Sequence, residues 1–482
     1  MRPKSAFHMF SLWAQIVACS LLSPAGAAAP LPVALTAPLA AAAIPLANAA
    51  IWVQEVGSSK PLLAHNPATP MNPASTMKLV TSYAALEILG PAFTWRTEAY
   101  ANGRVAGEVL EGDLVLRGMG DPKLTIENFW LLLRGLRARG LRDIQGDLVL
   151  DRTYYEARED DPGRFDNEPL RPYNVSPDAL LLNFKSVRFT FVPDEEGRTV
   201  LVMAEPHPAQ LEMTSSIRLA SGPCGDWRAR LKTDLVSSSA IARVNFSGAY
   251  PPSCAEKTWN IALLGHRAYV SGVFRQLWQE SGGIIRGGVR DGAAMPDARL
   301  LFTAESPSLA EVVRDINKFS NNVMARQLFL TLSAEVQKLP ANTDRSAQVV
   351  QAWLAQKSVD APELIMENGS GLSRRERISA ASMGKILIAA WHSAVMPEFI
   401  ASMPLVAHDG TMRRRLRYDS VAGQAHIKTG SLAEVRAVAG YVRDTTGRRF
   451  ALVFIVNHAH AAAAQPAQDA LIRWVYNGAA GR

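Results

Sequence analysis

The sequence predicts an α/β protein in which a sheet flanked by helices is formed by the two ends of the chain and interrupted by a β-rich insertion. Residues 51–90 show two short strand patterns and then a helical one, and residues 307–476 show several helical patterns and a strand pair. The second strand of that pair, 450–456, is a continuous apolar run, which predicts burial on both faces. Residues 96–299 show mostly short strand patterns.

A chain of 482 residues is long enough for two or three domains. We therefore expect residues 50–95 and 300–482 to form one domain and residues 96–299 to form two smaller β-rich domains. Residues 30–50 are rich in Ala and Pro and are expected to form a lead-in.

The composition indicates a globular protein with an ample core, because 48% of the residues are hydrophobic and 20% are charged. The net charge of +7 is modest and spread along the chain. The densest basic cluster, 413–417, lacks interleaved aromatic residues, so it indicates a solvated face and no nucleic-acid partner.

The N-terminus predicts export to the periplasm. Two basic residues precede an apolar run at 7–22, and small residues follow at 25–29, which is typical of a signal peptide spanning 1–29. Further small residues leave the cleavage site open between 27 and 49. Prolines interrupt this stretch, so we expect at most peripheral membrane association. A lipoprotein anchor at Cys19 is the alternative.

Two cysteines remain in the exported part, Cys224 and Cys254. In an oxidising compartment they are expected to form a disulfide, which would stabilise the fold by roughly 3–4 kcal/mol. Two free buried thiols are the alternative. No Cys/His spacing indicates a metal site, and no cofactor is predicted.

A candidate nucleophile is Ser75, which opens a helical pattern that ends at Gly90. Lys78 is three residues further on, so the two side chains are neighbours on a helix. A hydroxyl needs a base to become a nucleophile, and a lysine can be that base if its pKa is lowered. The pattern is short, and Ser382 with Lys385 is a second copy of it.

Two later motifs distinguish the copies. Ser320-Asn321-Asn322 lies inside one long helical pattern at 307–332, and Lys428-Thr429-Gly430-Ser431 ends a short strand pattern. Ser-x-x-Lys, Ser-Asp-Asn and Lys-Thr-Gly are the signature of penicillin-binding proteins and serine β-lactamases. Here the second motif is Ser-Asn-Asn, which keeps the Ser and the last Asn, and the order of the motifs is right. The Ser382 copy lies between the second and third motifs, so we interpret it as a helix start with Ser379 as its cap.

The chemistry of acyl transfer assigns four catalytic residues. Ser75 attacks a carbonyl, and Lys78 accepts its proton. Lys428 lowers the pKa of Lys78 and attracts a substrate carboxylate. Ser320 relays a proton towards the leaving nitrogen.

The remaining motif residues are expected to bind the substrate. Asn322 holds the substrate amide, and Thr429 and Ser431 bind a terminal carboxylate through their hydroxyl groups. Gly430 leaves room for the substrate backbone at the strand edge. The backbone N–H groups of Ser75 and Ser431 form the oxyanion hole.

Beyond these motifs, the chain resembles the low-molecular-mass class C penicillin-binding proteins, which are D-alanyl-D-alanine carboxypeptidases/endopeptidases. Similar stretches are 112–122, 409–411 and 368–374, where Asn368 replaces the first Asp of Asp-Gly-Ser-Gly-Leu-Ser-Arg. The resemblance implies a penicillin-binding transpeptidase-like α/β domain split around two inserted domains. The 245 positions between Ser75 and Ser320 also require an insertion.

The expected function is that of a serine DD-peptidase. It would cleave D-Ala-D-Ala termini of peptidoglycan stem peptides, and D-Ala crosslinks as a second substrate, and β-lactam antibiotics would be covalent inhibitors. The alternatives are a serine β-lactamase, which the long insertion disfavours, and a non-catalytic cell-wall binding protein with the same fold, which the complete motifs disfavour.

Four other residues were weighed. His458 and His460 share a strand face without a third ligand, so they indicate no metal site. His426 is expected to be structural, and Asp409 is expected to form a turn.

Overall fold

The structure is a computed structural model that describes residues 31–157 and 161–478. The predicted signal peptide and Cys19 lie outside the described residues. Within the described ranges, no helix is both long enough and apolar enough to cross a membrane.

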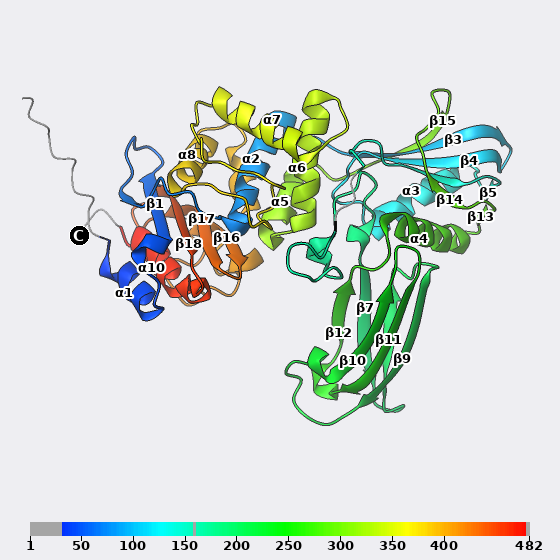
Figure 1. The fold of residues 1–482 in the computed structure, drawn as a ribbon, viewed down its shortest axis with the longest axis horizontal. Coiled ribbons are helices and arrows are strands. Elements are labelled where there is room, and N and C mark those ends of the chain that lie inside the picture. The colour runs from blue at the N-terminus through cyan, green and yellow to red at the C-terminus, as the bar shows by residue number, and fades with distance from the viewer. Residues whose placement is uncertain (1–30, 158–160, 479–482) are drawn as a thin grey trace, which may run out of the picture. The chain divides into compact units, whose positions relative to one another are not determined.

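Strands from both ends of the chain form one antiparallel sheet, in the order β16-β17-β18-β1-β2. In Figure 1, β1 in blue lies beside β18 in red. The α/β architecture expected from the sequence is therefore present. The five strands are β1 (Ala49–Glu55), β2 (Leu63–His65), β16 (Ala425–Leu432), β17 (Val435–Arg443) and β18 (Arg449–Asn457).

Helices cover both faces of this sheet (Figure 1). Alternate side chains of β18 belong to two different cores: Val453 packs with the helices of one face and Leu452 with those of the other, and both are fully buried. Burial of β18 on both faces is thus confirmed. One face carries α2 (Met77–Leu89), α5 (Leu309–Phe319), α6 (Asn322–Gln337), α7 (Thr343–Gln356), α8 (Ala380–Trp391) and α9 (Met396–Ser402), and the other carries α1 (Val33–Ala41) and α10 (Gln465–Tyr476).

One expected helix differs from the structure, and one helix was not foreseen. The long pattern at 307–332 is divided into α5 and α6, because Ser320 adopts a left-handed conformation with φ of 56° and Asn321 caps α6 by accepting from Met324 N at 3.1 Å. The lead-in expected at 30–50 contains α1, whose fully buried Leu35 and Leu39 pack in the core beneath α10.

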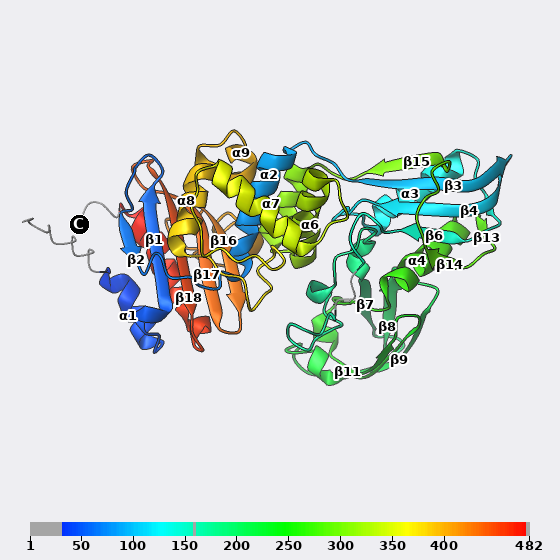
Figure 2. The ribbon, with the colours of Figure 1, turned by 45° about the horizontal axis from the view of Figure 1, so that its top comes forward.

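The first inserted sheet follows the order β13-β5-β4-β3-β15, with β6 and β14 paired beside it (Figure 2). Pairing of β15 with β3 places residues 300–305 in this sheet, although the expected boundary lay at 299. The strands are β3 (Arg96–Ala106), β4 (Val109–Gly118), β5 (Asp143–Ile144), β6 (Leu148–Asp151), β13 (Ile284–Ile285), β14 (Val289–Asp291) and β15 (Arg299–Glu305), accompanied by α3 (Ile126–Ala138) and α4 (His266–Glu280).

The second inserted sheet has six strands in the order β10-β11-β9-β8-β7-β12. Its buried side chains form one continuous cluster with those of the first inserted sheet, so the two sheets share a core. Its strands are β7 (Val187–Asp194), β8 (Thr199–Glu205), β9 (Leu211–Leu219), β10 (Leu231–Ser237), β11 (Ala242–Tyr250) and β12 (Lys257–Ile261).

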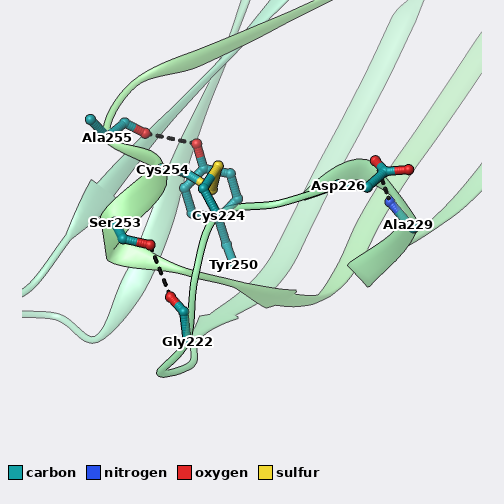
Figure 3. Close-up of a disulfide and its surroundings, with 8 residues drawn as sticks. All are labelled: Gly222, Cys224, Asp226, Ala229, Tyr250, Ser253, Cys254 and Ala255. Carbon is teal, nitrogen blue, oxygen red and sulfur yellow. Dashed lines mark hydrogen bonds between the residues drawn. A yellow bond between two sulfur atoms is a disulfide. The ribbon is translucent and has the colours of Figure 1, made fainter.

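The expected disulfide joins Cys224 and Cys254 and is confirmed (Figure 3). It ties the loop after β9 to the short turn after β11. Two hydrogen bonds support the same turn: Tyr250 donates to Ala255 O at 2.7 Å, and Ser253 donates to Gly222 O at 2.9 Å.

Helix α6 connects the inserted segment to the domain that carries the motifs. The side chain of Gln327 is fully buried and hydrogen-bonds both backbone groups of Asp178, accepting at 3.0 Å and donating at 2.8 Å. Tyr154 donates to Glu335 at 2.5 Å further along the same helix. Asn322 begins α6, so these contacts help to place the second motif.

Candidate active site

Ser75 lies in a single 3-10 turn, Ala74–Thr76, that leads into α2. The helix ends at Gly90 as expected. Apolar residues bury the first turn of α2 completely, and Lys78 is carried into the interior with them, leaving no exposed surface. The lysine amine is therefore held beside Ser75 in surroundings poor in water.

Lys78 Nζ is within hydrogen-bond distance of three oxygens. Ser75 Oγ lies at 3.0 Å and Asn322 Oδ1 at 2.6 Å, and the third oxygen is the backbone carbonyl of Ser370. A neutral amine has two N–H donors and one lone pair. Because the oxygens of Asn322 and Ser370 only accept, they use both donors. The lone pair is then directed to the hydroxyl proton of Ser75, as a base requires.

The surroundings of Lys78 favour its neutral form. Burial is the largest cause that lowers its pKa, and the positive charge of Lys428 is the second. Arg326 acts in the same direction, and Glu376 opposes it. The sequence-based hypothesis named burial or a second cation, Lys428, as the cause, and desolvation has the larger effect.

Lys428 is also fully buried, and burial lowers its pKa to about 7. Its Nζ donates to Ser320 Oγ at 2.8 Å and to its neighbour's carbonyl, Thr429 O, at 3.0 Å. The left-handed turn at Ser320 brings that hydroxyl out of the helical path and towards β16. The second and third motifs are thus joined through these two side chains.

β16 is the edge strand of the sheet, and its Lys-Thr-Gly segment lies against the Ser75 turn. A Cβ at Gly430 would be 2.7 Å from Pro73 O and 3.1 Å from Ser75 N, so only glycine permits this approach. Ile427 N donates to Pro404 O at the outer edge of β16. Backbone groups alternate along a strand, so the N–H of Ser431 faces the same edge.

The turn at 367–371, which the sequence marked through its Gly/Ser content and its similarity to a family stretch, supplies the Ser370 carbonyl. Glu376, which sequence reasoning missed, is fully buried and accepts backbone N–H groups of this turn. Thr411 was also missed as a contact; its hydroxyl lies 2.8 Å from Thr429 Oγ1. The Ser370 carbonyl could not be found from sequence, because every residue has a backbone carbonyl. Glu376 could not be found either, because a single Glu among charged residues does not indicate what it contacts.

The second Ser-x-x-Lys copy is not assembled. Ser382 N donates to the Ser379 hydroxyl at 3.0 Å, so the expected cap is present, and Lys385 is exposed. Asp409 accepts from Leu405 N at 2.7 Å in a turn and from Lys318 Nζ at 2.6 Å.

The described residues contain no group of three or more His, Cys, Asp or Glu side chains placed to hold a metal ion. The rings of His458 and His460 lie 5.1 Å apart, edge to face. His426 is half-buried, and burial lowers its pKa.

A cavity of about 480 Å³ adjoins the 367–371 turn. It lies between this part of the chain and the inserted segment, and both charge signs line it. Residues from the two segments include Asp161, Phe165, Phe329, Asn368 and Arg374.

Comparisons with known proteins were made for the whole chain. A family model described as the D-Ala-D-Ala carboxypeptidase 3 (S13) family matches residues 31–477. A D-alanyl-D-alanine carboxypeptidase of Actinomadura sp. (strain R39) is 28% identical over 440 residues, which cover 87% of this chain and 80% of the relative. The D-alanyl-D-alanine carboxypeptidase DacB of Haemophilus influenzae is 23% identical over 412 residues, covering 85% of each chain.

Solved structures show the same fold. The crystal structure of penicillin binding protein 4 (dacB) from Haemophilus influenzae matches with a TM-score of 0.75 at 23% identity, covering 89% of this chain and 96% of that one. A second structure of that protein, complexed with a β-lactam, matches with a TM-score of 0.71 at 22% identity. The expected fold class, a penicillin-binding transpeptidase-like domain with inserted domains, is confirmed.

Proposed function

Because this chain belongs to the D-Ala-D-Ala carboxypeptidase 3 (S13) family, we propose that it removes the terminal D-alanine of peptidoglycan stem peptides through an acyl-enzyme at Ser75. Family membership makes the chain a hydrolase. The serine mechanism and the residues that perform it are the proposed part. The observation that carries the proposal is the environment of Lys78, which leaves its lone pair for the Ser75 hydroxyl proton.

In the first step, Ser75 Oγ attacks the carbonyl carbon of the penultimate D-alanine while its proton passes to Lys78 Nζ. The negative charge that develops on the carbonyl oxygen is stabilised by the backbone N–H groups of Ser75 and Ser431. The C–N bond then breaks, and the leaving D-alanine nitrogen takes a proton through Ser320. Water hydrolyses the resulting ester and restores the free serine.

The Lys-Thr-Gly segment would bind the terminal carboxylate of the substrate. Lys428 supplies positive charge, and the hydroxyl groups of Thr429 and Ser431 supply donors. Asn322 would hold the substrate amide through its N–H groups, since its oxygen already accepts from Lys78. The polar cavity beside the 367–371 turn would receive substrate groups outside the scissile bond.

The same nucleophile would be acylated by β-lactams, and D-Ala crosslinks would be a second substrate. Such substrates belong to the cell wall, so we also propose that the chain is exported and acts in the periplasm. We propose residues 50–95 with the chain after β15 as the catalytic domain, and the segment between them as the insertion.

The test compares wild type, Ser75→Ala and Lys78→Ala. We expect a fluorescent penicillin to label the wild type, to leave Ser75→Ala unlabelled, and to acylate Lys78→Ala about 10²–10⁴-fold more slowly, because a positioned base contributes about that factor. Lys385→Ala, at the unassembled second copy, is the matched control and should label like wild type. Labelling of Lys78→Ala at the wild-type rate would contradict the assignment of Lys78 as the general base.

Purified sacculi distinguish the substrate classes. Release of D-alanine by wild type, but not by Ser75→Ala, supports the carboxypeptidase, and loss of crosslinked muropeptides supports the second substrate. Rapid turnover of benzylpenicillin without a persistent adduct would instead favour a β-lactamase. If folded wild type releases no D-alanine and leaves the crosslinked muropeptides intact, a non-catalytic wall-binding protein is favoured.

A further inference from the structure

Glu376 is a buried acid that the proposed mechanism does not use. Its side chain has no exposed surface. One carboxylate oxygen accepts three consecutive backbone N–H groups, from Glu367 at 3.1 Å, Asn368 at 2.9 Å and Gly369 at 2.9 Å. The other oxygen is buried and has no hydrogen-bond partner among the described residues. Burial raises the pKa of this carboxyl above its usual value, although the three N–H groups and Lys78 act in the opposite direction. The hydrogen bonds fix the acid at a defined place beside the turn.

The turn that Glu376 holds is the turn that binds Lys78. The residue after Gly369 is Ser370, whose carbonyl accepts from Lys78 Nζ. Gly369 O in turn accepts from the Thr81 hydroxyl, one helical turn beyond Lys78, at 2.7 Å. The turn is therefore fastened to α2 on one side and to Glu376 on the other.

Three charged groups act on Lys78 from the elements packed around it. Lys428 comes from β16 and Arg326 from α6, and both are positive. Glu376 is the acid of the set, considering the described residues. Asn368, at the place where the resembling motif has Asp, contributes an amide that accepts from Ser370 N at 2.9 Å and donates to Leu372 O at 3.0 Å.

We propose that Glu376 is a positioning residue for the general base: it holds the 367–370 turn, and with it the Ser370 carbonyl, against Lys78, and in its ionised form it places a negative charge that opposes the positive charges of Lys428 and Arg326. This inference rests on the proposed function, because it assumes that Lys78 takes the proton of Ser75. The residue acts through Lys78 and through the Ser370 carbonyl.

The expected direction follows from electrostatics. A nearby carboxylate favours the ammonium form of a lysine, so its removal lets Lys78 lose its proton at lower pH. Glu376→Gln removes the charge and retains an oxygen that can accept the three N–H groups. When the acylation rate is plotted against pH, its rise on the acidic side (the acidic limb) should therefore move to lower pH in this variant.

The experiment measures the rate at which a fluorescent penicillin acylates the full chain between pH 4.5 and 9. We expect the acidic limb of Glu376→Gln to lie about one pH unit below that of wild type, the size of shift that a close charge produces. Glu363→Gln is the matched control: Glu363 also accepts a backbone N–H, from Ser379 at 2.9 Å, but it is partly exposed and does not act on Lys78. An unmoved limb in Glu376→Gln, or equal shifts in both variants, would overturn the proposal.

If Glu376→Gln does not yield folded protein, Glu376→Asp takes its place. It keeps the charge but withdraws it by one carbon, so a smaller shift to lower pH is expected, and an unmoved limb contradicts the proposal. Failure of the proposed function looks different, because wild type itself would then not be acylated at any pH.

Discussion

Two buried lysines are the decisive side chains at the scale of single residues. Neither Lys78 nor Lys428 has exposed surface, and burial is the largest cause of the lowered pKa of each. Removing water disfavours the charged form, which converts an ordinary ammonium group into an available base. Burial of the two amines also lowers the free energy of unfolding. We therefore expect substitutions that remove these amines to stabilise the fold while they impair activity.

The stability of the protein should depend on pH through Lys428. Its folded pKa of about 7 lies below the ordinary lysine value of 10.5, so the folded state binds fewer protons between these two pH values. The destabilisation is therefore full below pH 7 and disappears as the pH rises to about 10.5. We expect Lys428→Met to raise the unfolding free energy by about 2 kcal/mol at pH 6, after loss of its hydrogen bonds, and by less at pH 9.5.

Urea unfolding of wild type and variant at several pH values measures this difference. Lys385→Met, which removes an exposed lysine, should show no such pH dependence. A gain from Lys428→Met that is the same at pH 6 and pH 9.5 would contradict the prediction.

At the scale of elements, the site depends on two backbone features. The left-handed Ser320 divides what the pattern predicts as one helix, and Asn321 then caps the second half. Gly430 lets β16 approach the Ser75 turn closely enough that a methyl group would meet backbone atoms. Asn321 and Gly430 supply no reactive group themselves. They position the motif residues beside them.

Gly430→Ala should slow acylation strongly with little effect on folding. The added Cβ would be 2.7 Å from Pro73 O, so β16 has to move away from Ser75. Misplacement by less than about 1 Å is enough to lower a rate on the order of 10²-fold. Gly57→Ala is the control, because a Cβ there meets nothing within 4 Å. Acylation of Gly430→Ala at the wild-type rate would show that this close approach is unimportant.

The disulfide should affect the insertion alone. Replacing Cys224 and Cys254 by Ser removes a link across 30 residues, which we expect to lower the stability of the second inserted sheet by roughly 3 kcal/mol. Thermal unfolding measures the loss, and penicillin acylation at 25 °C should be unchanged. An acylation rate that falls with the disulfide would instead indicate coupling between the inserted sheet and the site.

At the scale of the whole molecule, the five-stranded sheet that carries the Lys-Thr-Gly motif is completed by strands from opposite ends of the sequence. β1 pairs with β18 along its whole length, and α1 packs with α10 beneath them. Helix α6 then joins this domain to the insertion through the buried side chain of Gln327. The insertion is consequently in contact with the helix that begins at Asn322.

The packing of α1 predicts where an exported form begins. Cleavage near Ala49 would remove α1 and with it the fully buried Leu35 and Leu39, each of which stabilises the fold by about 2 kcal/mol. We therefore expect the mature chain to begin near residue 30, after the earlier group of small residues. N-terminal sequencing of any exported form decides this, and a start at residue 50 would contradict it.

The sequence by itself determined the fold class, the buried β18 and the disulfide, because each depends on residue types at fixed local spacing or on motif order along the chain. It also named Ser75 as the candidate nucleophile, which stays a prediction. It did not reveal α1, the break at Ser320, the Ser370 carbonyl or Glu376. A backbone carbonyl has no signature in sequence, and the effect of Glu376 on Lys78 exists only once segments almost 300 residues apart are folded together. Only the tertiary structure decided how water is excluded from the two lysines, and burial is the largest cause of the lowered pKa of each.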